Sequence, residues 1–443
     1  MLRTLHMKDV GPSARFDLEL GERLNVLTGD NGLGKSFVLD VAWWVLTGTW
    51  VGRAVLPRTG NEETAEIRFQ LDLPKRYEGQ SHRASFRRMR QDWEDPVRHL
   101  GRARSETGSG VWTPDWLLAG DWAPVIYARA DGAFSIWDPA RNYPVPASSE
   151  DVNAVPRPYH FGATELWNGL ELDGKPICNG LIQDWTRWWL EAAGGKSSPF
   201  ELLRDVLGQL SHPSEPMTPG EPRRLYLDDV RDYPTIDLPY GNVPIAHLSA
   251  GMRRIVSLAY LIVWTWSEHE KACKLLGWKP AERIVFLADE VELHLHPQWQ
   301  RHIAPRLLDV LEGLGTRMRP QVLMTTHSPM VLASLEPHFD MAKDKLFLFE
   351  LRENNISLRD VPWTKRGDAA SWLTSPIFGL EQARSPEAEK AIEAAYDYMA
   401  GRHTELPQGL GTDKEIDREL HRLLSDQDKF WPRWVVYRER KSA

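Results

Sequence analysis

The chain has 443 residues, of which 42% are hydrophobic and 26% are charged, with a formal net charge of −8. Such a composition is typical of a globular protein with two or three domains, and the negative charge argues against indiscriminate binding of nucleic acid. No apolar run is long enough to span a bilayer, the N-terminus lacks a signal-peptide layout, and the 2 cysteines form no disulfide framework. We therefore expect a cytoplasmic protein with no membrane partner.

The first recognisable motif follows a short apolar stretch, residues 24–27, that predicts a buried strand. A G-x-x-x-x-G-K-S phosphate loop comes next, and residues 36–47 after it have the apolar spacing of a helix. Backbone N–H groups of such a loop, together with the helix N-terminus, bind phosphate; the lysine reaches the β- and γ-phosphates and the serine holds Mg²⁺. The loop residues and the residue that follows them are Gly29, Asp30, Asn31, Gly32, Leu33, Gly34, Lys35, Ser36 and Phe37.

The segments after this helix alternate between apolar and polar residues over 65–73 and near 84–86. Residues 125–129 and 134–137 flank Asp131-Gly132, which predicts a hairpin. These strands indicate an antiparallel layer beside the nucleotide site. Residues 178–193 and 199–210 then read as helices, and the prolines at 213–244 predict an irregular connection.

The second half of the chain returns to regular structure. We predict helices over 250–266, 298–314 and 385–401, and buried strands over 283–288 and 321–326. The predicted class is α/β, a mixed sheet around the phosphate loop with an antiparallel layer, a helical insertion and a small α+β C-terminal region. The expected domains are an N-terminal lobe (1–175), an insertion (176–244), a C-terminal lobe (245–350) and a C-terminal region that could bind a partner (351–443).

Two carboxylates, Asp289 and Glu290, stand at the end of the strand predicted over 283–288. Neighbouring residues of a strand point to opposite faces, so Asp289 can hold Mg²⁺ while Glu290 polarises the water that attacks the γ-phosphate. The alternative is that both cap the helix that follows. The phosphate loop upstream favours the functional interpretation.

Two further motifs have both a structural and a functional interpretation. Ser249, Ala250 and Gly251 open a helix, where the serine is a good N-cap but could also meet the phosphate of a nucleotide held by another subunit. His327 follows a buried strand, where it could be structural or could hydrogen-bond a terminal phosphate.

The order of these motifs resembles that of the ABC ATPases, within them the soluble branch of SMC, RecF and overcoming-lysogenisation heads. The resemblance rests on residues 24–36, on the Leu-Ser-x-Gly-x-x-Arg segment that begins at Leu248, on the run 289–297 and on residues 325–329. Stand-alone ATPases of bacterial antiphage systems, such as Septu and PARIS, belong to the same group.

The resemblance implies bound ATP and Mg²⁺, with two nucleotides sandwiched in a head-to-tail homodimer or a higher homo-oligomer. Lys35 and Ser36 would contact phosphate and Mg²⁺, Glu290 would be the catalytic base and His327 the switch histidine. The glutamine that senses Mg²⁺ is assigned to Gln183, with Gln70 and Gln91 as alternatives. His294 and His296 are expected at the subunit contact rather than in a metal site.

Two functions fit this resemblance. The first is an ATP-gated scaffold or regulator of a separate effector, expected to be a nuclease encoded next door, in antiphage defence. This interpretation is favoured because the chain lacks long coiled-coil arms and a nuclease motif. The alternative is a DNA-binding ATPase of repair or recombination. Duplex DNA would bind along a basic stretch between Arg83 and Arg104, which can also be a charged loop: Arg83, Arg87, Arg88, Arg90, Arg98, Arg102 and Arg104.

Overall fold

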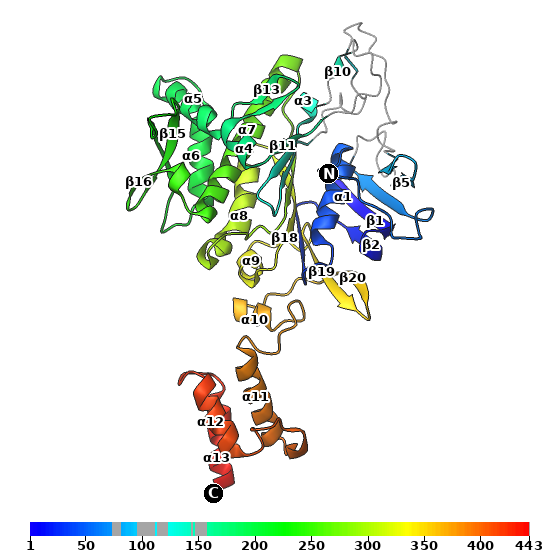
Figure 1. Ribbon diagram of the computed structural model, residues 1–443, viewed down its shortest axis with the longest axis vertical. Helices are drawn as coiled ribbons and strands as arrows, with labels where there is room; N and C mark the ends of the chain where they lie inside the picture. The colour runs from blue at the N-terminus through cyan, green and yellow to red at the C-terminus, as the bar shows by residue number, and fades with distance from the viewer. Residues whose placement is uncertain (73–80, 95–110, 113–122, 143–144, 147–156, 443) are drawn as a thin grey trace. The chain divides into compact units, whose positions relative to one another are not determined.

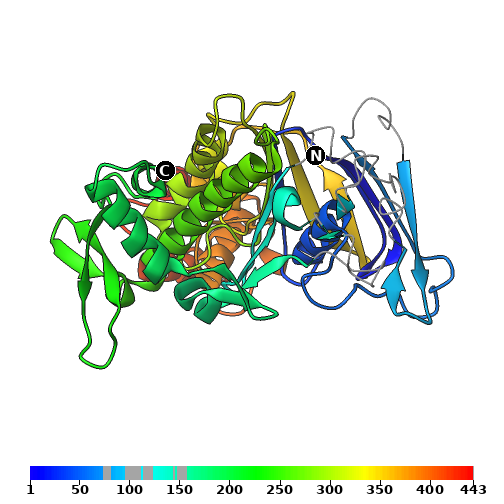
Figure 2. The same ribbon diagram turned by 90° about the horizontal axis from the view of Figure 1, so that it is seen from above.

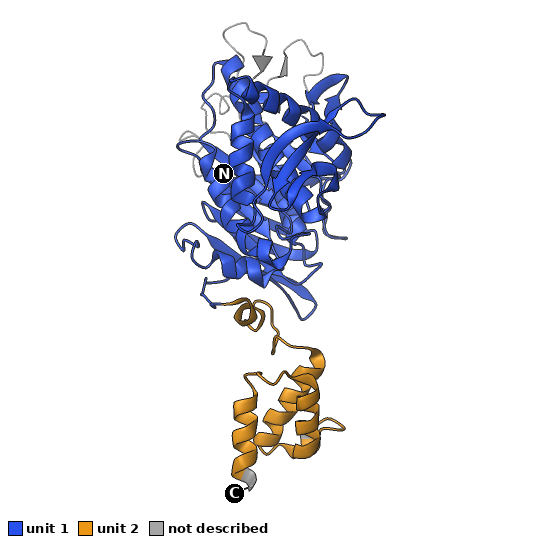
Figure 3. Cartoon of the chain, turned by 90° about the vertical axis from the view of Figure 1, so that its left-hand side faces the viewer, with its two compact units in different colours: residues 1–367 blue, residues 368–443 orange. Residues whose placement is uncertain are grey.

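The computed structural model describes residues 1–72, 81–94, 111–112, 123–142, 145–146 and 157–442. These residues form two compact units, 1–367 and 368–443 (Figure 3). Within the described ranges, no helix has both the length and the apolar character that crossing a membrane requires.

An eight-stranded sheet forms the centre of the first unit, in the order β11-β9-β8-β17-β18-β3-β19-β20. The run from β8 to β19 is parallel, so the carboxyl ends of β8, β17, β18, β3 and β19 meet at one edge. Antiparallel strands close both sides of the sheet. The strands are β3 (Leu24–Gly29), β8 (Val125–Ala128), β9 (Phe134–Trp137), β11 (Tyr159–Phe161), β17 (Arg283–Ala288), β18 (Arg319–Thr325), β19 (Lys345–Arg352) and β20 (Asn355–Asp360).

A second, antiparallel sheet has the order β2-β1-β4-β5-β6, which confirms the predicted antiparallel layer. The β8–β9 hairpin forms as predicted but belongs to the central sheet, because β8 pairs in parallel with β17. The strands are β1 (Leu2–Val10), β2 (Ser13–Glu19), β4 (Glu66–Leu71), β5 (Ser81–Arg87) and β6 (Asp92–Trp93).

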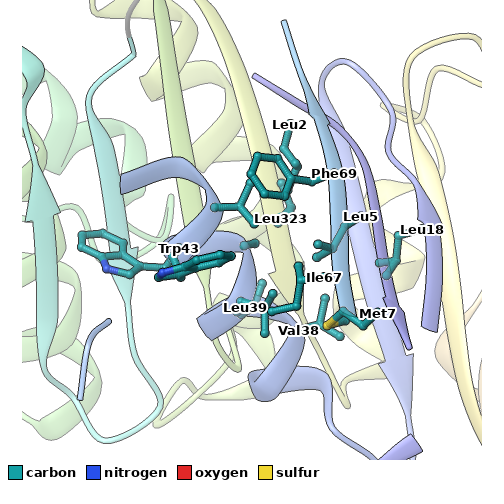
Figure 4. Packing of buried hydrophobic residues seen from close by; sticks show 14 of the residues in the cluster. Leu2, Leu5, Met7, Leu18, Val38, Leu39, Trp43, Ile67, Phe69 and Leu323 are labelled. Atoms are coloured by element: carbon teal, nitrogen blue, oxygen red, sulfur yellow. The ribbon is translucent and has the colours of Figure 1, made fainter. Parts of the chain in front are cut away.

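Helix α1 (Lys35–Thr47) lies between the two sheets (Figure 1, Figure 2). Apolar side chains from both sheets and from the helix form one continuous core, in which Trp43 is completely buried (Figure 4). Burying such side chains contributes about 1.5–3 kcal/mol each. This core therefore fixes the first turn of α1, and with it Lys35, against both sheets.

The opposite face of the central sheet is covered by helices (Figure 1). Helix α7 begins at its cap Ser249 and ends at Gly277, whose φ of 71° gives the left-handed turn; it is ten residues longer than predicted because the apolar stripe continues to Cys273. The helices here are α3 (Pro139–Asn142), α6 (Pro199–Leu210), α7 (Ala250–Leu276), α8 (Pro297–Gly313) and α9 (Pro329–Leu335), with the 3-10 turn η2 (Ile245–His247) before α7.

The insertion is not only helical. The proline-rich stretch predicted to be irregular forms a three-stranded sheet, β14-β15-β16, which corrects that prediction. Its β14 strand shifts register between Gly220 and Arg223, and such a bulge accommodates Pro222. The elements are α4 (Ala163–Asn168), β12 (Leu170–Leu172), β13 (Lys175–Cys178), α5 (Leu181–Ala193), β14 (Thr218–Arg224), β15 (Asp232–Leu238) and β16 (Gly241–Pro244); the short pair β7 (Val111–Trp112) and β10 (Val145–Pro146) precedes them.

The second unit begins at Asp368, whereas the sequence-based boundary at 351 falls inside the β19–β20 hairpin of the first unit. Its helices have their own apolar core, centred on the completely buried Trp434. A capping box at Thr412 and Glu415 starts one of them. The elements are α10 (Ala369–Leu373), α11 (Pro386–Met399), η3 (His403–Glu405), α12 (Asp413–Leu423) and α13 (Trp431–Ser442).

Candidate nucleotide site

The phosphate loop can form only with glycine at its bends. Gly29 has φ 128° and Gly34 has φ 96°, conformations that other residues rarely adopt. A Cβ on Gly29 would lie 2.1 Å from the carbonyl oxygen of Phe349, and a Cβ on Gly34 would lie 2.8 Å from Cγ of Pro12. The chain therefore turns sharply between β3 and α1, as a phosphate-binding loop requires.

The polar residues of the loop face solvent, whereas Leu33 and Lys35 are buried. The Nζ of Lys35 donates to the carbonyl oxygens of Gly29, at 2.9 Å, and Asp30, at 2.6 Å. Burial lowers the pKa of Lys35, and the neighbouring acidic side chains, Glu290 first, partly offset this effect. The ammonium group therefore lies in the loop, where a phosphate can replace the carbonyl oxygens.

Ser36 is exposed, so its hydroxyl is accessible at the N-terminus of α1. The neighbouring Phe37 packs against the apolar core. A Cβ on Gly11, which has φ 66°, would lie 2.3 Å from the Phe37 ring. In this chain Phe37 therefore anchors the first turn of the helix through its ring.

The two carboxylates after β17 differ in their surroundings, as alternation predicts. Asp289 is 5% exposed and accepts the hydroxyl of Thr325 at 2.7 Å. The same hydroxyl accepts the backbone N–H of Glu290 at 2.7 Å. Glu290 is half-buried with φ 50°, and its carboxylate makes no hydrogen bond within the described residues. Thr325 thus fixes Asp289 and leaves the Glu290 side chain available.

His327 lies at the same edge of the central sheet, where the parallel strands end, and directly follows β18. Burial lowers the pKa of its imidazole, and the positive charge of Lys35 lowers it further, while Glu290 and Asp289 oppose this effect. The lowered pKa favours the neutral form of the ring. Its backbone N–H donates to Oε1 of Glu292 at 2.6 Å. The structure thus brings together Lys35, Asp289, Glu290 and His327.

The polar groups at this site fit a nucleoside triphosphate with Mg²⁺. The glycines at the bends of the loop carry no Cβ, which leaves room for the backbone to turn, and Lys35 supplies a positive charge. The hydroxyl of Ser36 and the carboxylate of Asp289 are the oxygen ligands that Mg²⁺ prefers. When bound, the ion would neutralise charge on the phosphates.

Ser249 caps α7 by accepting the N–H of Met252 at 3.3 Å, so the capping interpretation is confirmed. Ser249 and Ala250 are exposed. A Cβ on Gly251 would lie 2.7 Å from the carbonyl oxygen of His294, so only glycine allows this close approach. In the described part of the chain, no hydrogen bond or ion pair joins this segment to the phosphate loop of the same chain.

The glutamine assigned to Mg²⁺ does not lie with the phosphate loop and the two carboxylates. Gln183 is exposed on α5, which packs against α4, α6 and the β14–β15 pair and lies apart from α1 (Figure 1, Figure 2). Gln70 lies on β4 and Gln91 in a turn after β5, both outside the edge. All three stay predictions without a contact that supports them.

The two histidines after Glu290 are exposed, and His296 caps α8 by accepting the N–H of Gln298. Among the described residues, one group of acidic, histidine or cysteine side chains is close enough to share an ion, and it lies in the second unit. That group consists of Glu381, Glu389 and Glu393, and it lacks both histidines. The histidine pair is thus not part of a metal cluster in the described residues.

The basic stretch is partly neutralised. Arg83 pairs with Glu66 at 3.1 Å and Arg87 pairs with Glu94 at 2.6 Å. Arg88 and Arg90 are exposed. The remaining members, Arg98, Arg102 and Arg104, lie outside the described residues.

Sequence reasoning missed several residues at this edge. Thr325 and Glu292 bridge the segments after β17 and β18, and the hydroxyl of Tyr127 donates to Asp40 at 3.1 Å beside them. Burial raises the pKa of Asp40. The Thr325-Thr326 pair before His327 was the one available signal, because hydroxyl groups at a strand end often bind neighbouring polar groups.

The parallel strands, the phosphate loop and the paired carboxylates have the arrangement that is typical of an ABC-type ATPase head. The comparisons confirm the resemblance to the SMC, RecF and antiphage ATPase branch at the level of the family. Residues 232–333 match the family described as "AAA domain, putative AbiEii toxin, Type IV TA system".

Relatives from bacterial defence systems share parts of the chain. "Septu protein PtuA" of Bacillus mycoides is 32% identical over 278 residues, which cover 61% of this chain and 35% of that protein. "Retron Ec83 probable ATPase" of Escherichia coli is 30% identical over 114 residues, which cover 26% of this chain and 18% of that protein. The matches thus span about a third or less of these relatives.

Solved structures of SMC heads are also similar. The SMC head domain from Thermotoga maritima aligns with 82% of this chain and 99% of its own, at 13% identity and a TM-score of 0.36. An SmcHead bound to the C-winged helix domain of ScpA aligns with 81% of this chain and 97% of its own, at 12% identity and a TM-score of 0.38. The fold assignment rests on the order and direction of the strands, not on these values.

Proposed function

We propose that this chain binds ATP with Mg²⁺ and hydrolyses it at the carboxyl edge of the central sheet. The observation that carries the proposal is the convergence of Lys35, Asp289, Glu290 and His327, whose charges act on one another. A lysine in a glycine loop, a carboxylate for Mg²⁺ and a second group that orients the attacking water are the recurring parts of sites that transfer a phosphoryl group to water.

Each side chain has a role that follows from its surroundings. Lys35 binds phosphate oxygens and neutralises their charge. Glu290, whose carboxylate makes no hydrogen bond with the described residues, accepts a proton from the attacking water. The neutral imidazole of His327 donates a hydrogen bond to the terminal phosphate, and Asp289 and Ser36 hold Mg²⁺.

We also propose that two copies close around ATP, head to tail. Ser249 and Ala250 are exposed at the start of a 27-residue helix and are not joined to their own phosphate loop. The free N–H groups and the dipole of such a helix favour a phosphate brought by another copy.

Light scattering of the Glu290→Gln variant with ATP and Mg²⁺ tests this dimer, because blocked hydrolysis should preserve it. Adding Ser249→Arg should return the protein to a monomer while each copy still binds ATP. A dimer that persists with Ser249→Arg would contradict the proposed arrangement. The matched control is Ser81→Arg, at an exposed serine on β5 of the antiparallel sheet, which should leave the dimer intact.

We further propose that the ATPase acts as a nucleotide-gated scaffold or regulator of a separate effector in bacterial antiphage defence. The support is the sequence similarity to a Septu protein and a retron ATPase. Co-expression with the products of neighbouring genes tests this role. We expect a nuclease to be retained, and retention should differ between ATP-bound Glu290→Gln and nucleotide-free Lys35→Ala. Failure of all neighbours to bind either state would overturn it.

The DNA-binding alternative has less support, because Arg83 and Arg87 already pair with acidic residues. If DNA binds this stretch, neutralising Arg87, Arg88 and Arg90 together should make affinity less dependent on salt. The slope should fall by about one unit for each phosphate that is no longer neutralised. An unchanged slope, with turnover indifferent to DNA, would favour the scaffold.

A further inference from the structure

Glu292 has an unusual position for a carboxyl group. It lies two residues after Glu290, and its Oε1 accepts the backbone N–H of His327 at 2.6 Å. Its Oε2 is buried and accepts no hydrogen bond of normal geometry from the described residues. Burial raises the pKa of this carboxyl, and the bond from the His327 backbone and the nearby Thr326 hydroxyl oppose the change. A buried oxygen without such a bond costs about 1–3 kcal/mol, so the site retains this residue at a cost.

The bond from His327 differs from the others in its segment. The N–H of Ser328 donates to the Thr326 hydroxyl at 3.0 Å, and Ser328 caps α9 by accepting the N–H groups of Met330 and Val331. The N–H groups of Ser328, Met330 and Val331 thus bond to side chains at positions 326 and 328, whereas the N–H of His327 bonds to the distant side chain of Glu292. Glu292 therefore ties the backbone of His327 to the segment that carries Glu290.

That second segment is itself constrained. Glu290 has φ 50° and His294 has φ 63°, both in the left-handed region that favours glycine. Such a backbone conformation costs about 1–3 kcal/mol of folding free energy at each residue and persists only where the surrounding structure fixes it. Glu292 lies between them, and its bond to His327 is one of the contacts that hold this turn in place.

We propose that Glu292 is a positioning residue, which sets the distance between the His327 imidazole and the Glu290 carboxylate through its bond to the His327 backbone. This inference rests on the proposed ATPase function, since it assigns the relative placement of two groups in that reaction. Oε1 is the atom that matters, and the negative charge is dispensable.

The variants Glu292→Ala and Glu292→Gln separate these contributions. Alanine removes the acceptor, whereas glutamine keeps it and removes the charge. In the full chain, we expect Glu292→Ala to lower kcat by about tenfold or more with KM for ATP within about twofold, as expected when a transition-state interaction is lost. Glu292→Gln should restore kcat to near that of the unchanged protein. Equal losses in both variants, or an unchanged kcat with alanine, would overturn the proposal.

Asp344→Ala provides a matched control, because Asp344 is also a buried carboxylate that accepts backbone N–H groups, from Leu24 and Asp340, but at the start of β19. This variant should lower thermal stability and leave kcat per folded molecule unchanged. A loss of kcat similar to that of Glu292→Ala would mean that removing any buried carboxylate slows hydrolysis, which would contradict the specific role of Glu292.

Hydrogen exchange of the His327 amide, measured without nucleotide, gives a second readout. Protection should fall with Glu292→Ala and persist with Glu292→Gln; unchanged protection with alanine would contradict the placement. If the unchanged protein fails to hydrolyse ATP, the proposed function fails, and the exchange measurement still decides whether Glu292 positions His327.

Discussion

The two edges of the central sheet bury polar groups in opposite ways. At the amino edge, Asp344 is fully buried and accepts bonds from the Arg23 side chain and the Leu24 backbone. Gln321, also fully buried, bonds both backbone groups of Leu2 and the carbonyl of Gly21. The amide of Asn25 is paired in the same manner.

At the carboxyl edge, polar groups are left incompletely paired. The Glu290 carboxylate and the His327 ring make no hydrogen bond with described residues, and Oε2 of Glu292 is buried and accepts no hydrogen bond of normal geometry from them. Buried polar groups are normally satisfied, so unpaired groups that gather at one edge beside a phosphate loop are open to a ligand. The difference teaches that one edge provides stability and the other provides function, at a cost in stability.

The largest expected effect is that of Lys35→Ala on ATP binding at the carboxyl edge. Removing the ammonium group leaves the glycine loop without its positive charge, so we expect ATP affinity to fall by about a hundredfold or more. Titration with a fluorescent ATP analogue measures this loss. Thermal stability should change little, because Nζ bonds only loop carbonyls; unchanged affinity would mean that the nucleotide binds elsewhere.

Asp344→Ala should have the opposite signature. It removes the carboxylate that pairs most closely with the partly buried Arg23, which keeps only Glu312 at 4.0 Å and the His338 carbonyl, and it leaves two backbone N–H groups unpaired. The unfolding free energy should therefore fall by about 2–4 kcal/mol. Denaturant unfolding measures the change. ATP affinity should stay within about twofold at temperatures where the variant is folded. A variant as stable as the unchanged chain would show that the amino edge does not stabilise the fold as argued.

A smaller effect concerns pH. Because burial lowers the pKa of His327 in the folded chain, the unfolded chain binds this proton first as pH falls. The stability from this group is therefore present above its ordinary pKa of 6.5 and is lost as pH falls through the lowered folded value. His327→Gln should make the decline in unfolding free energy on the acid side shallower. An identical decline in both proteins would contradict a lowered pKa of the His327 imidazole in the folded chain.

The same comparison explains what the sequence could predict. The phosphate loop, the Asp289-Glu290 strand end and His327 are local patterns. In each of them, the residue types within a few positions are enough to predict the role. Thr325 and Glu292 could not be assigned, because their roles depend on β17 and β18 lying side by side. Gly277, rather than the apolar spacing, decides where α7 ends.

The insertion was the least predictable part. Prolines made residues 213–244 look irregular, yet Pro219 and Pro234 lie in paired strands of a small sheet with a register shift. The assignment of Gln183 depended on how α5 packs, and the structure packs α5 against that small sheet. Short-range patterns carry no information on such packing, so a ligand role assigned from spacing alone gains no support there.

Single-turnover hydrolysis by the Glu290→Gln variant, with ATP and Mg²⁺, tests the central claim most directly. The account predicts that ATP still binds with near-unchanged affinity, while hydrolysis slows by about a hundredfold to ten-thousandfold, the range expected for loss of a general base. Hydrolysis at the rate of the unchanged protein would contradict the claim that the open carboxylate at this edge activates the attacking water.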